Sequence, residues 1–356
     1  MSRLKEVIQD ESALRVVLDV HRADYVRILK EAAGNREEEY KKYRRQRTLG
    51  LVILFAFPFL TLLANPLLWL PGWMSFLVAS GLIVLALTLL LTGWRVIREF
   101  HSVVDCTLYP PVVALLGLTA RVLSPQRPLP RKREETLAFT EKLKQLFALQ
   151  QTEHKEKERV LERLSHSLLI TEPYNTTQVD LILEFTYKGS VCQVAELDVS
   201  QVTGSGKNRS VRQIFHGYFV EVPLKRPVEG RTFVTAEKDT TGFGHRSLFG
   251  GEAVETVLEW NEFEELLHVA TTNEVEARYI LTPNFMTDLY TWWKGQDEGV
   301  IRVSFIGQRM YILFPDRTMK LHDTVAALTE EAVGEYVFTI ARPFFHIAQL
   351  LEDVRL

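Results

Sequence analysis

The sequence predicts an α+β protein, in which a two-helix transmembrane hairpin is joined to a cytoplasmic domain with a largely antiparallel sheet and flanking helices. Two observations carry this prediction. Residues 48–94 contain no Asp, Glu, Lys or Arg, and the apolar pattern changes from helical to strand periodicity near residue 180. The chain of 356 residues is also too long to fold around one ordinary hydrophobic core. We therefore expect five segments: an N-terminal cytoplasmic helical segment (1–47), the hairpin (48–94), a helical connector (95–170), an α+β domain (171–323) and a C-terminal helical region (324–356).

The hairpin is predicted from length and charge together. A bilayer core of about 30 Å takes about 20 helical residues to cross, so the uncharged run is long enough for two crossings. Pro71-Gly72 is the best turn between them. The run begins too far from the N-terminus and is too long for a signal peptide. One long buried core helix is the alternative, and uncharged runs of this length are rare outside membranes.

The charges beside the hairpin predict its orientation. The basic segment Lys41–Arg47 precedes it, Arg95 and Arg98 follow it, and the connecting turn is uncharged. By the positive-inside rule, both termini are expected in the cytoplasm. Two cysteines, which form no disulfide framework, agree with a reducing compartment.

Residues 106–123 are apolar but too short for a convincing third crossing, so they are expected to form a core helix or an interfacial one, with core favoured. A proline-rich, charged break at 124–135 then precedes a long amphipathic helix at 136–169. The apolar positions of this helix suit either the cytoplasmic domain or a second copy of the helix.

Strands are predicted at 181–187, 191–202, 211–222 and 231–237, with short polar turns at 188–190, 203–210 and 223–230. A helix should begin at Pro283, because Thr282 is a good N-cap and proline suits the first helical position. Two further strands, at 300–307 and 309–315, lead to a final helical region.

The segment TGSGKNRS, Thr203–Ser210, resembles a phosphate-binding loop only superficially. Such a loop needs a first glycine where Gln201 stands and a Ser or Thr where Asn208 stands. It must also lie between a strand and a helix, whereas this segment lies between two strands. We therefore predict a hairpin connection and no phosphate site there.

Other patterns give little support for catalysis. Glu196 and Asp198 share one strand face, which suits an acid/base pair or, equally, a solvated surface. His216 is isolated in a strand pattern, and no histidine and cysteine spacing suits zinc. No catalytic residue, metal or cofactor is expected. The net charge of −3 gives no general reason for nucleic-acid binding, so no nucleic-acid partner is expected.

Two segments resemble a known bacterial family. VEARYILTPNFM at Val275–Met286 and FHGYFVEVPLKRPVEGRTFV at Phe215–Val234 are similar to the signature of the family called domain of unknown function 3137. The resemblance covers roughly 171–323, and paired spans ahead of such a domain also match the family. This chain departs from the family pattern at the position before Gly217, where it has His216 and a basic residue is expected. The resemblance implies a bacterial inner-membrane location and brings no known activity.

The sequence therefore predicts a bacterial inner-membrane protein whose cytoplasmic domain binds a protein partner or itself, as an interaction or scaffolding module. The lipid bilayer is its other expected partner, and an enzymatic role is disfavoured. The alternative is a membrane-surface enzyme or small-molecule binder that uses the glycine-rich loop Gly242–Gly251. Its candidate binding residues are His245, Arg246, Glu276, Arg278 and Tyr279.

Overall fold

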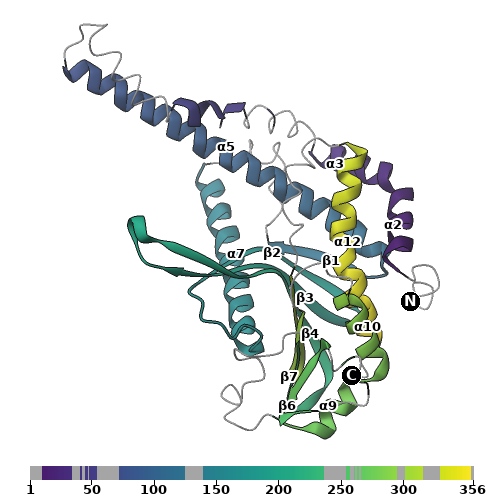
Figure 1. Cartoon of the computed structure of the whole chain (residues 1–356). Coiled ribbons are helices and arrows are strands. Elements are labelled where there is room, and N and C mark those ends of the chain that lie inside the picture. The colour runs from purple at the N-terminus through teal and green to yellow at the C-terminus, as the bar shows by residue number, and fades with distance from the viewer. Residues whose placement is uncertain are drawn as a thin grey trace.

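The computed structural model places one antiparallel sheet between a long helix on one face and a group of helices on the other (Figure 1). It describes residues 10–33, 41, 45–46, 48–53, 72–124, 139–235, 254–256, 260, 263, 266–294, 301–315 and 329–353. The predicted α+β class, with an antiparallel sheet and flanking helices, is confirmed.

The sheet has seven strands in the described residues. They follow the order β1-β2-β3-β4-β6-β5, and β7 also pairs with β4. Each neighbouring pair is antiparallel, as the run of short polar connections predicted. The strands are β1 (Thr119–Ser124), β2 (Thr176–Tyr187), β3 (Ser190–Thr203), β4 (Ser210–Thr235), β5 (Val254–Glu255), β6 (His268–Thr271) and β7 (Arg302–Pro315).

Two predicted turns are confirmed. Lys188 and Gly189 connect β2 to β3, and both have positive φ, which suits the twist of a tight hairpin. The segment Thr203–Ser210 connects β3 to β4 through a short 3-10 turn, Gly206–Asn208, and its two end residues pair with each other. This segment is a hairpin turn, as its sequence predicts.

The predicted turn at 223–230 is wrong, because this segment lies within β4. The pairing of β4 with β7 shifts in register between Pro223 and Val228 and again between Val228 and Arg231. These bulges accommodate the prolines and Gly230, so the strand continues through them. In the same way, the two strands expected at 300–307 and 309–315 are one strand, β7.

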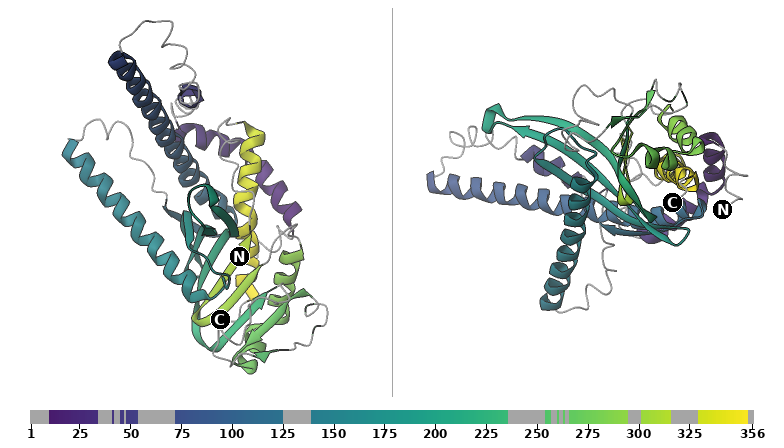
Figure 2. Two further views of the ribbon diagram at one scale, coloured as in Figure 1. Left: turned by 60° about the vertical axis from the view of Figure 1, so that its left-hand side comes forward. Right: turned by 90° about the horizontal axis from the view of Figure 1, so that it is seen from below.

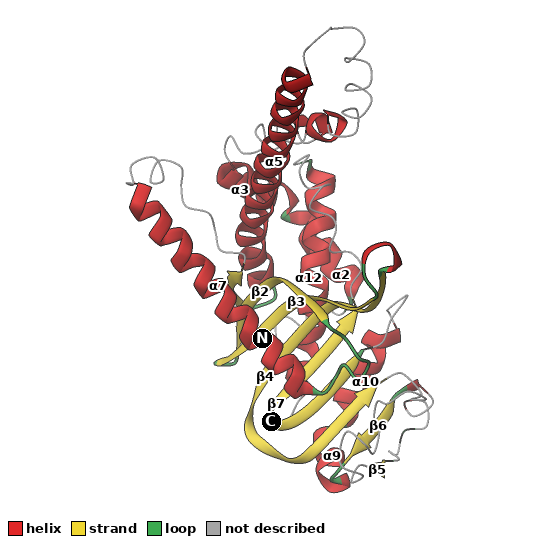
Figure 3. Ribbon diagram, turned by 90° about the vertical axis from the view of Figure 1, so that its left-hand side faces the viewer, coloured by secondary structure: helices red, strands yellow, loops and turns green. Residues whose placement is uncertain are grey.

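The two faces of the sheet carry separate hydrophobic clusters. One cluster joins alternate side chains of β2, including Leu183 and Phe185, to the helices behind the sheet. The other joins Val179, Leu197 and Phe219 to a single helix, α7 (Phe139–Ser167), which lies across the front of the sheet in Figure 3. This division follows from the strand period of two residues. The position of α7 confirms the amphipathic helix expected at 136–169.

Helix α5 (Gly72–Leu115) extends the second half of the uncharged run into the core of the domain. Its buried residues Phe100, Val104, Leu108 and Val112 recur every four positions and pack in the larger cluster. The core helix favoured for 106–123 is confirmed only as far as Leu115: α5 continues through Pro110 and Pro111, and β1 begins four residues after it ends. Within the described parts of the chain, no helix combines the length and hydropathy that crossing a bilayer requires. The first expected span lies mostly in 54–71, outside the described residues.

The helices that precede and follow the uncharged run pack together (Figure 2). Leu14, Leu18 and Leu29, from α2 (Glu11–Val20) and α3 (Arg22–Ala33), lie in the same cluster as the residues of α12 (Glu330–Asp353). Arg342 Nε of α12 donates to Glu11 Oε1 at 2.9 Å, and His346 Nε2 lies 2.8 Å from the same oxygen. Residues from both ends of the chain therefore build one core.

Two helices near the end of the sheet complete the fold. Helix α9 (Glu274–Ile280) follows β6, and α10 (Pro283–Lys294) follows α9. The backbone N–H of Phe285 donates to Thr282 Oγ1 at 3.3 Å, so the predicted N-cap before Pro283 is confirmed.

Candidate functional site

The five residues expected to bind a ligand fall into two groups. His245 and Arg246, with the glycine-rich loop around them, lie outside the described residues. Glu276, Arg278 and Tyr279 lie on α9 at the end of the sheet. The structure therefore addresses only the second group.

The α9 residues contact an arginine that was not among the expected binding residues. Arg226 of β4 forms an ion pair with Glu276 at 2.8 Å, and its guanidinium carbon lies 4.5 Å from the ring centre of Tyr279. Arg278 is exposed and engaged in another interaction. Tyr279 is half exposed. Arg226 was assigned to a turn, and its only sequence signal was its charge beside two prolines.

Asp198, which was considered with Glu196 as an acid/base pair or part of a solvated face, contacts a histidine of the neighbouring strand. Asp198 lies opposite His216 in the β3–β4 ladder, and His216 Nδ1 is 3.4 Å from Asp198 Oδ2. Ser200 Oγ and Gln213 Nε2 donate to the same carboxylate, at 3.0 and 3.1 Å. The serine therefore bonds to the carboxylate and not to the imidazole, so this group lacks the order of a nucleophile, base and orienting acid.

A buried polar group behind the sheet holds helices together. The Tyr336 hydroxyl of α12 donates to Asp105 Oδ1 of α5 at 2.7 Å, and the Tyr109 and Tyr218 hydroxyl oxygens are 3.3 Å apart. Complete burial and the Asp105 carboxylate raise the pKa of Tyr336 well above its ordinary value. Tyr336 therefore stays a protonated donor, and the group ties α5 to α12 and the sheet.

A polar cavity of about 270 Å³ lies between α7 and the front of the sheet. Three of its residues form a row across neighbouring strands, since Glu184 pairs with Gln193 and Gln193 pairs with Glu221. Side chains of α7 cover this row. The cavity is lined by Glu156, Arg159 and Arg163 of α7, Glu184 of β2, Val191 and Gln193 of β3, Glu221 and Pro223 of β4, and Arg309 of β7.

Glu221 forms the floor of this polar cavity, with only 3% of its side chain exposed. Arg163 Nη1 lies 2.5 Å from Glu221 Oε2, and Arg309 forms a second ion pair with the other carboxylate oxygen. Arg163 Nη1 also donates to Gln193 Oε1 at 2.8 Å. Burying a carboxylate is costly, and two guanidinium groups from different elements offset that cost here.

The packing of α7 explains why its arginines face the row formed by Glu184, Gln193 and Glu221. Val160 and Leu164, four residues apart, are buried against the sheet. Arg159 and Arg163 flank this apolar stripe at the same spacing, so they lie on one side of the helix. Arg159 Nη1 donates to Glu156 Oε1 at 2.5 Å and stays mostly exposed at the rim.

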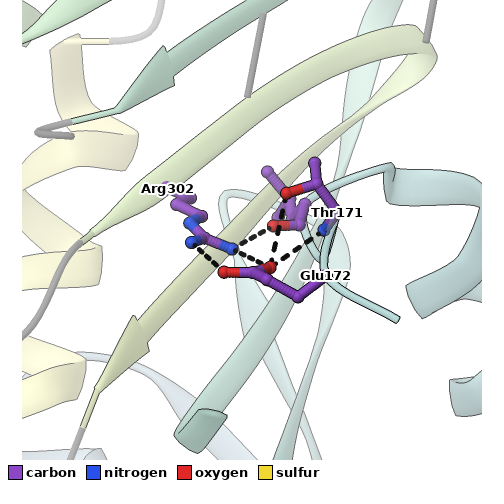
Figure 4. Close-up of polar contacts among 4 residues, drawn as sticks. Thr171, Glu172 and Arg302 are labelled. Carbon is purple, nitrogen blue, oxygen red and sulfur yellow. Dashed lines mark hydrogen bonds and ion pairs between the residues drawn. The ribbon is translucent and has the colours of Figure 1, made fainter. Parts of the chain in front are cut away.

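An ion pair beyond the C-terminal end of α7 fixes the position of that helix (Figure 4). Arg302 of β7 donates from Nη2 to Glu172 Oε1 at 3.0 Å and from Nη1 to Glu172 Oε2 at 3.3 Å. Its Nη1 also donates to the Leu169 carbonyl at 2.9 Å. Burial of Glu172 opposes its ionisation, but the hydrogen bonds and charge of Arg302 outweigh that effect and hold its pKa below the ordinary value.

The polar cavity is lined mainly by arginine and glutamate side chains. Among the described residues that line it, none is a Cys, Ser or His that could serve as a nucleophile or as a base near neutral pH. Cys192 belongs to the cluster on the opposite face, where burial raises its pKa to about 12. Within the parts of the chain that the structure describes, no three His, Cys, Asp or Glu side chains are grouped to hold a metal ion.

This cavity was not predicted from the sequence. Its one local signal was Glu221, an acid inside the apolar strand segment YFVEV. A charge at such a position needs a partner, but the sequence did not indicate that Arg163 and Arg309 would supply it.

The expected family resemblance is confirmed for the C-terminal part of the chain. Residues 213–356 match the family described as protein of unknown function (DUF3137). The match begins within β4 and contains β7, so it includes Glu221 and Arg309, whereas α7, β2 and β3 precede it. No curated protein and no solved structure matches this chain.

Proposed function

We propose that this chain, whose residues 213–356 match a family of unknown function, is anchored in a lipid bilayer by a hairpin over residues 48–94. The remainder forms an interaction domain at the membrane surface. The observation that carries the proposal is the shared core of α2, α3, α5 and α12, which contains residues from both sides of the uncharged run. If that run enters a bilayer, both of its ends must return to the same side, which requires an even number of crossings.

Exposed apolar side chains support the membrane part of the proposal. Ile83, Val84, Leu85 and Leu87 of α5 are 37–62% exposed. Successive helical residues point about 100° apart, so these side chains cover several sides of the helix. A single protein partner would cover one stripe, whereas lipid surrounds a helix. This part of α5 projects away from the sheet (Figure 1).

A close contact supports the hairpin itself. A side chain added at Gly50 would lie 3.3 Å from the Ala86 carbonyl oxygen and 3.3 Å from Leu89 Cβ, so the segment at Gly50 lies directly against α5. Small residues at such contacts let membrane helices approach closely. Ala86 is fully buried among exposed neighbours, as one contact face of a helix pair would be.

The orientation and location follow from charge and from the family resemblance. The basic segment Lys41–Arg47 and the residues Arg95 and Arg98 flank the proposed hairpin. The positive-inside rule therefore puts the termini and the sheet domain in the cytoplasm. With the bacterial family resemblance, the proposed location is the bacterial inner membrane.

The exposed side of α9 supports an interaction role. Val275 and Tyr279, four residues apart, are 81% and 49% exposed, and Arg226 lies over the tyrosine ring. Tyrosine and arginine are enriched at protein interfaces, where they act as rigid anchors. The proposed partner is another protein or a second copy of the chain.

Two measurements test the two parts of this proposal. Carbonate extraction of host membranes should leave the wild-type chain in the membrane fraction. Val84→Lys with Leu87→Lys should release it, because each charge costs about 3 kcal/mol at a helix centre; Val191→Lys, on the sheet, is the matched control. A wild-type chain that is extracted with the soluble proteins contradicts the anchor.

For the interaction, affinity purification in mild detergent should give a reproducible companion or a homo-oligomer by light scattering. Val275→Glu should reduce that association, and Val16→Glu, on the exposed side of α2, should not. A clean monomer without a specific companion contradicts the interaction role.

A further inference from the structure

The polar cavity between α7 and the sheet has the charge arrangement of a small anion site. One buried carboxylate, Glu221, lies between the guanidinium groups of Arg163 and Arg309, so this trio carries a net charge of +1. Arg159 adds a guanidinium at the rim, paired with Glu156. Three arginines and three glutamates thus line the cavity, with Arg163 and Arg309 beside the buried Glu221 and Arg159 at the rim.

The two floor arginines retain hydrogen-bonding capacity. The contacts of Arg163 with Gln193 and Glu221 both involve Nη1, and the contact of Arg309 with Glu221 also involves Nη1. A guanidinium has five N–H donors arranged as a fork that matches a carboxylate or phosphate. The Nη2 and Nε groups of both arginines remain for a ligand or for water.

The size of the cavity limits the ligand. Its volume of about 270 Å³ lies just below the usual range for small-molecule sites. At about 30 Å³ for each water, the space equals that of about nine water molecules. It suits a solute with one oxyanion group and a short polar body, and the rim carboxylates Glu156 and Glu184 favour a ligand that also carries hydroxyl groups.

We propose that this cavity binds a small soluble oxyanion, a phosphate or a carboxylate, through Arg159, Arg163 and Arg309. The ion pairs of Glu221 with Arg163 and Arg309 hold both arginines in place. The ligand would join α7 to β4 and β7, so its binding would stabilise the position of α7 on the sheet. This inference stands on the cavity alone and is independent of the proposed membrane anchor.

Thermal unfolding of the full-length protein in mild detergent tests the inference. Tryptophan fluorescence is followed against increasing inorganic phosphate or citrate, with chloride at matched ionic strength as the reference. A bound anion raises Tm in a saturable manner by mass action. We expect that response for at least one of the two anions, and its absence for both overturns the proposal.

Three variants locate the site. Arg159→Gln should weaken the apparent affinity by roughly 10-fold, since a hydrogen bond to a charged group is lost. Arg27→Gln is its matched control, an exposed helical arginine that also pairs with an acid three residues before it. Glu221→Gln should tighten binding by roughly 10-fold, because it removes the negative charge that competes for the arginines.

The direction of the Glu221→Gln effect separates a ligand site from a structural ion network. A network without a ligand role predicts lower stability in that variant and no gain in anion affinity. Equal affinities for Arg159→Gln and Arg27→Gln would show that the anion binds elsewhere. Since both arginines are exposed helix positions, the comparison holds even where Glu221→Gln fails to fold.

Discussion

Truncating Leu14 in the first helix should destabilise the whole protein. Its side chain is fully buried, in the cluster that also holds α5 and α12. Leu14→Ala removes three carbons, and their transfer alone is worth about 2.4 kcal/mol. The cavity left behind brings the usual cost of such substitutions to about 2–5 kcal/mol. For a domain of this size, a loss of about 3 kcal/mol lowers Tm by about 6–12 °C.

The same helix supplies the control for this prediction. Val16 is 65% exposed, so Val16→Ala should change stability by less than about 0.5 kcal/mol. Thermal unfolding in mild detergent, followed by tryptophan fluorescence, compares the two variants with the wild type, because the buried Trp292 packs against His346 of α12. Equal Tm values for the two variants would refute the reasoning, since the N-terminal helices would then lie outside the cooperative core.

Three further predictions follow from single contacts. Arg302→Ala should cost about 2–4 kcal/mol in denaturant unfolding, somewhat below the cost for a fully buried pair because Glu172 keeps 25% of its side chain exposed. Since the folded pKa of Glu172 is lowered, its contribution is complete above its unfolded pKa of about 4.5 and is lost as pH falls through the lower folded value. An acid titration of Tm should therefore be less steep below about pH 4.5 in Glu172→Gln than in the wild type, and identical slopes would contradict this. Gly230→Ala should lower Tm more than Gly189→Ala: both glycines have positive φ, but an added Cβ at Gly230 would lie 2.5 Å from Thr272 Oγ1, whereas that at Gly189 meets open space. Equal losses would show that backbone conformation alone sets the cost.

The sequence correctly predicted those helices, strands and turns that a few neighbouring residues determine. Thr282 and Pro283 predicted the start of α10, and the small and polar residues of Thr203–Ser210 predicted a hairpin turn. The change to strand periodicity predicted the antiparallel sheet. In each case the deciding residues lie within a few positions of one another.

The errors arose where long-range packing overrides local signals. Pro223 and Gly230 are typical of turns, yet pairing with β7 carries β4 through them. Residues 119–123 were expected to end a core helix, yet pairing with β2 makes them part of β1.

The candidate site was harder to predict for the same reason. The candidate residues Glu276 and Tyr279 lie on one helix, and their partner Arg226 comes from a distant strand. The polar cavity combines α7 with four strands, and its key pairs join Arg163 and Arg309 to Glu221. A single sequence carries no signal for contacts at such separations.

The proposed membrane anchor requires both ends of the uncharged run to lie on the same side of a bilayer. In a chain with Cys106→Ser and Cys192→Ser, single cysteines at the exposed positions Val20 and Val275 report the two ends. A membrane-impermeant maleimide is applied to intact spheroplasts and to permeabilised ones. We predict that Val20→Cys and Val275→Cys are both protected in intact spheroplasts and both labelled after permeabilisation. Labelling of only one of them in intact spheroplasts would contradict the hairpin and the shared core together.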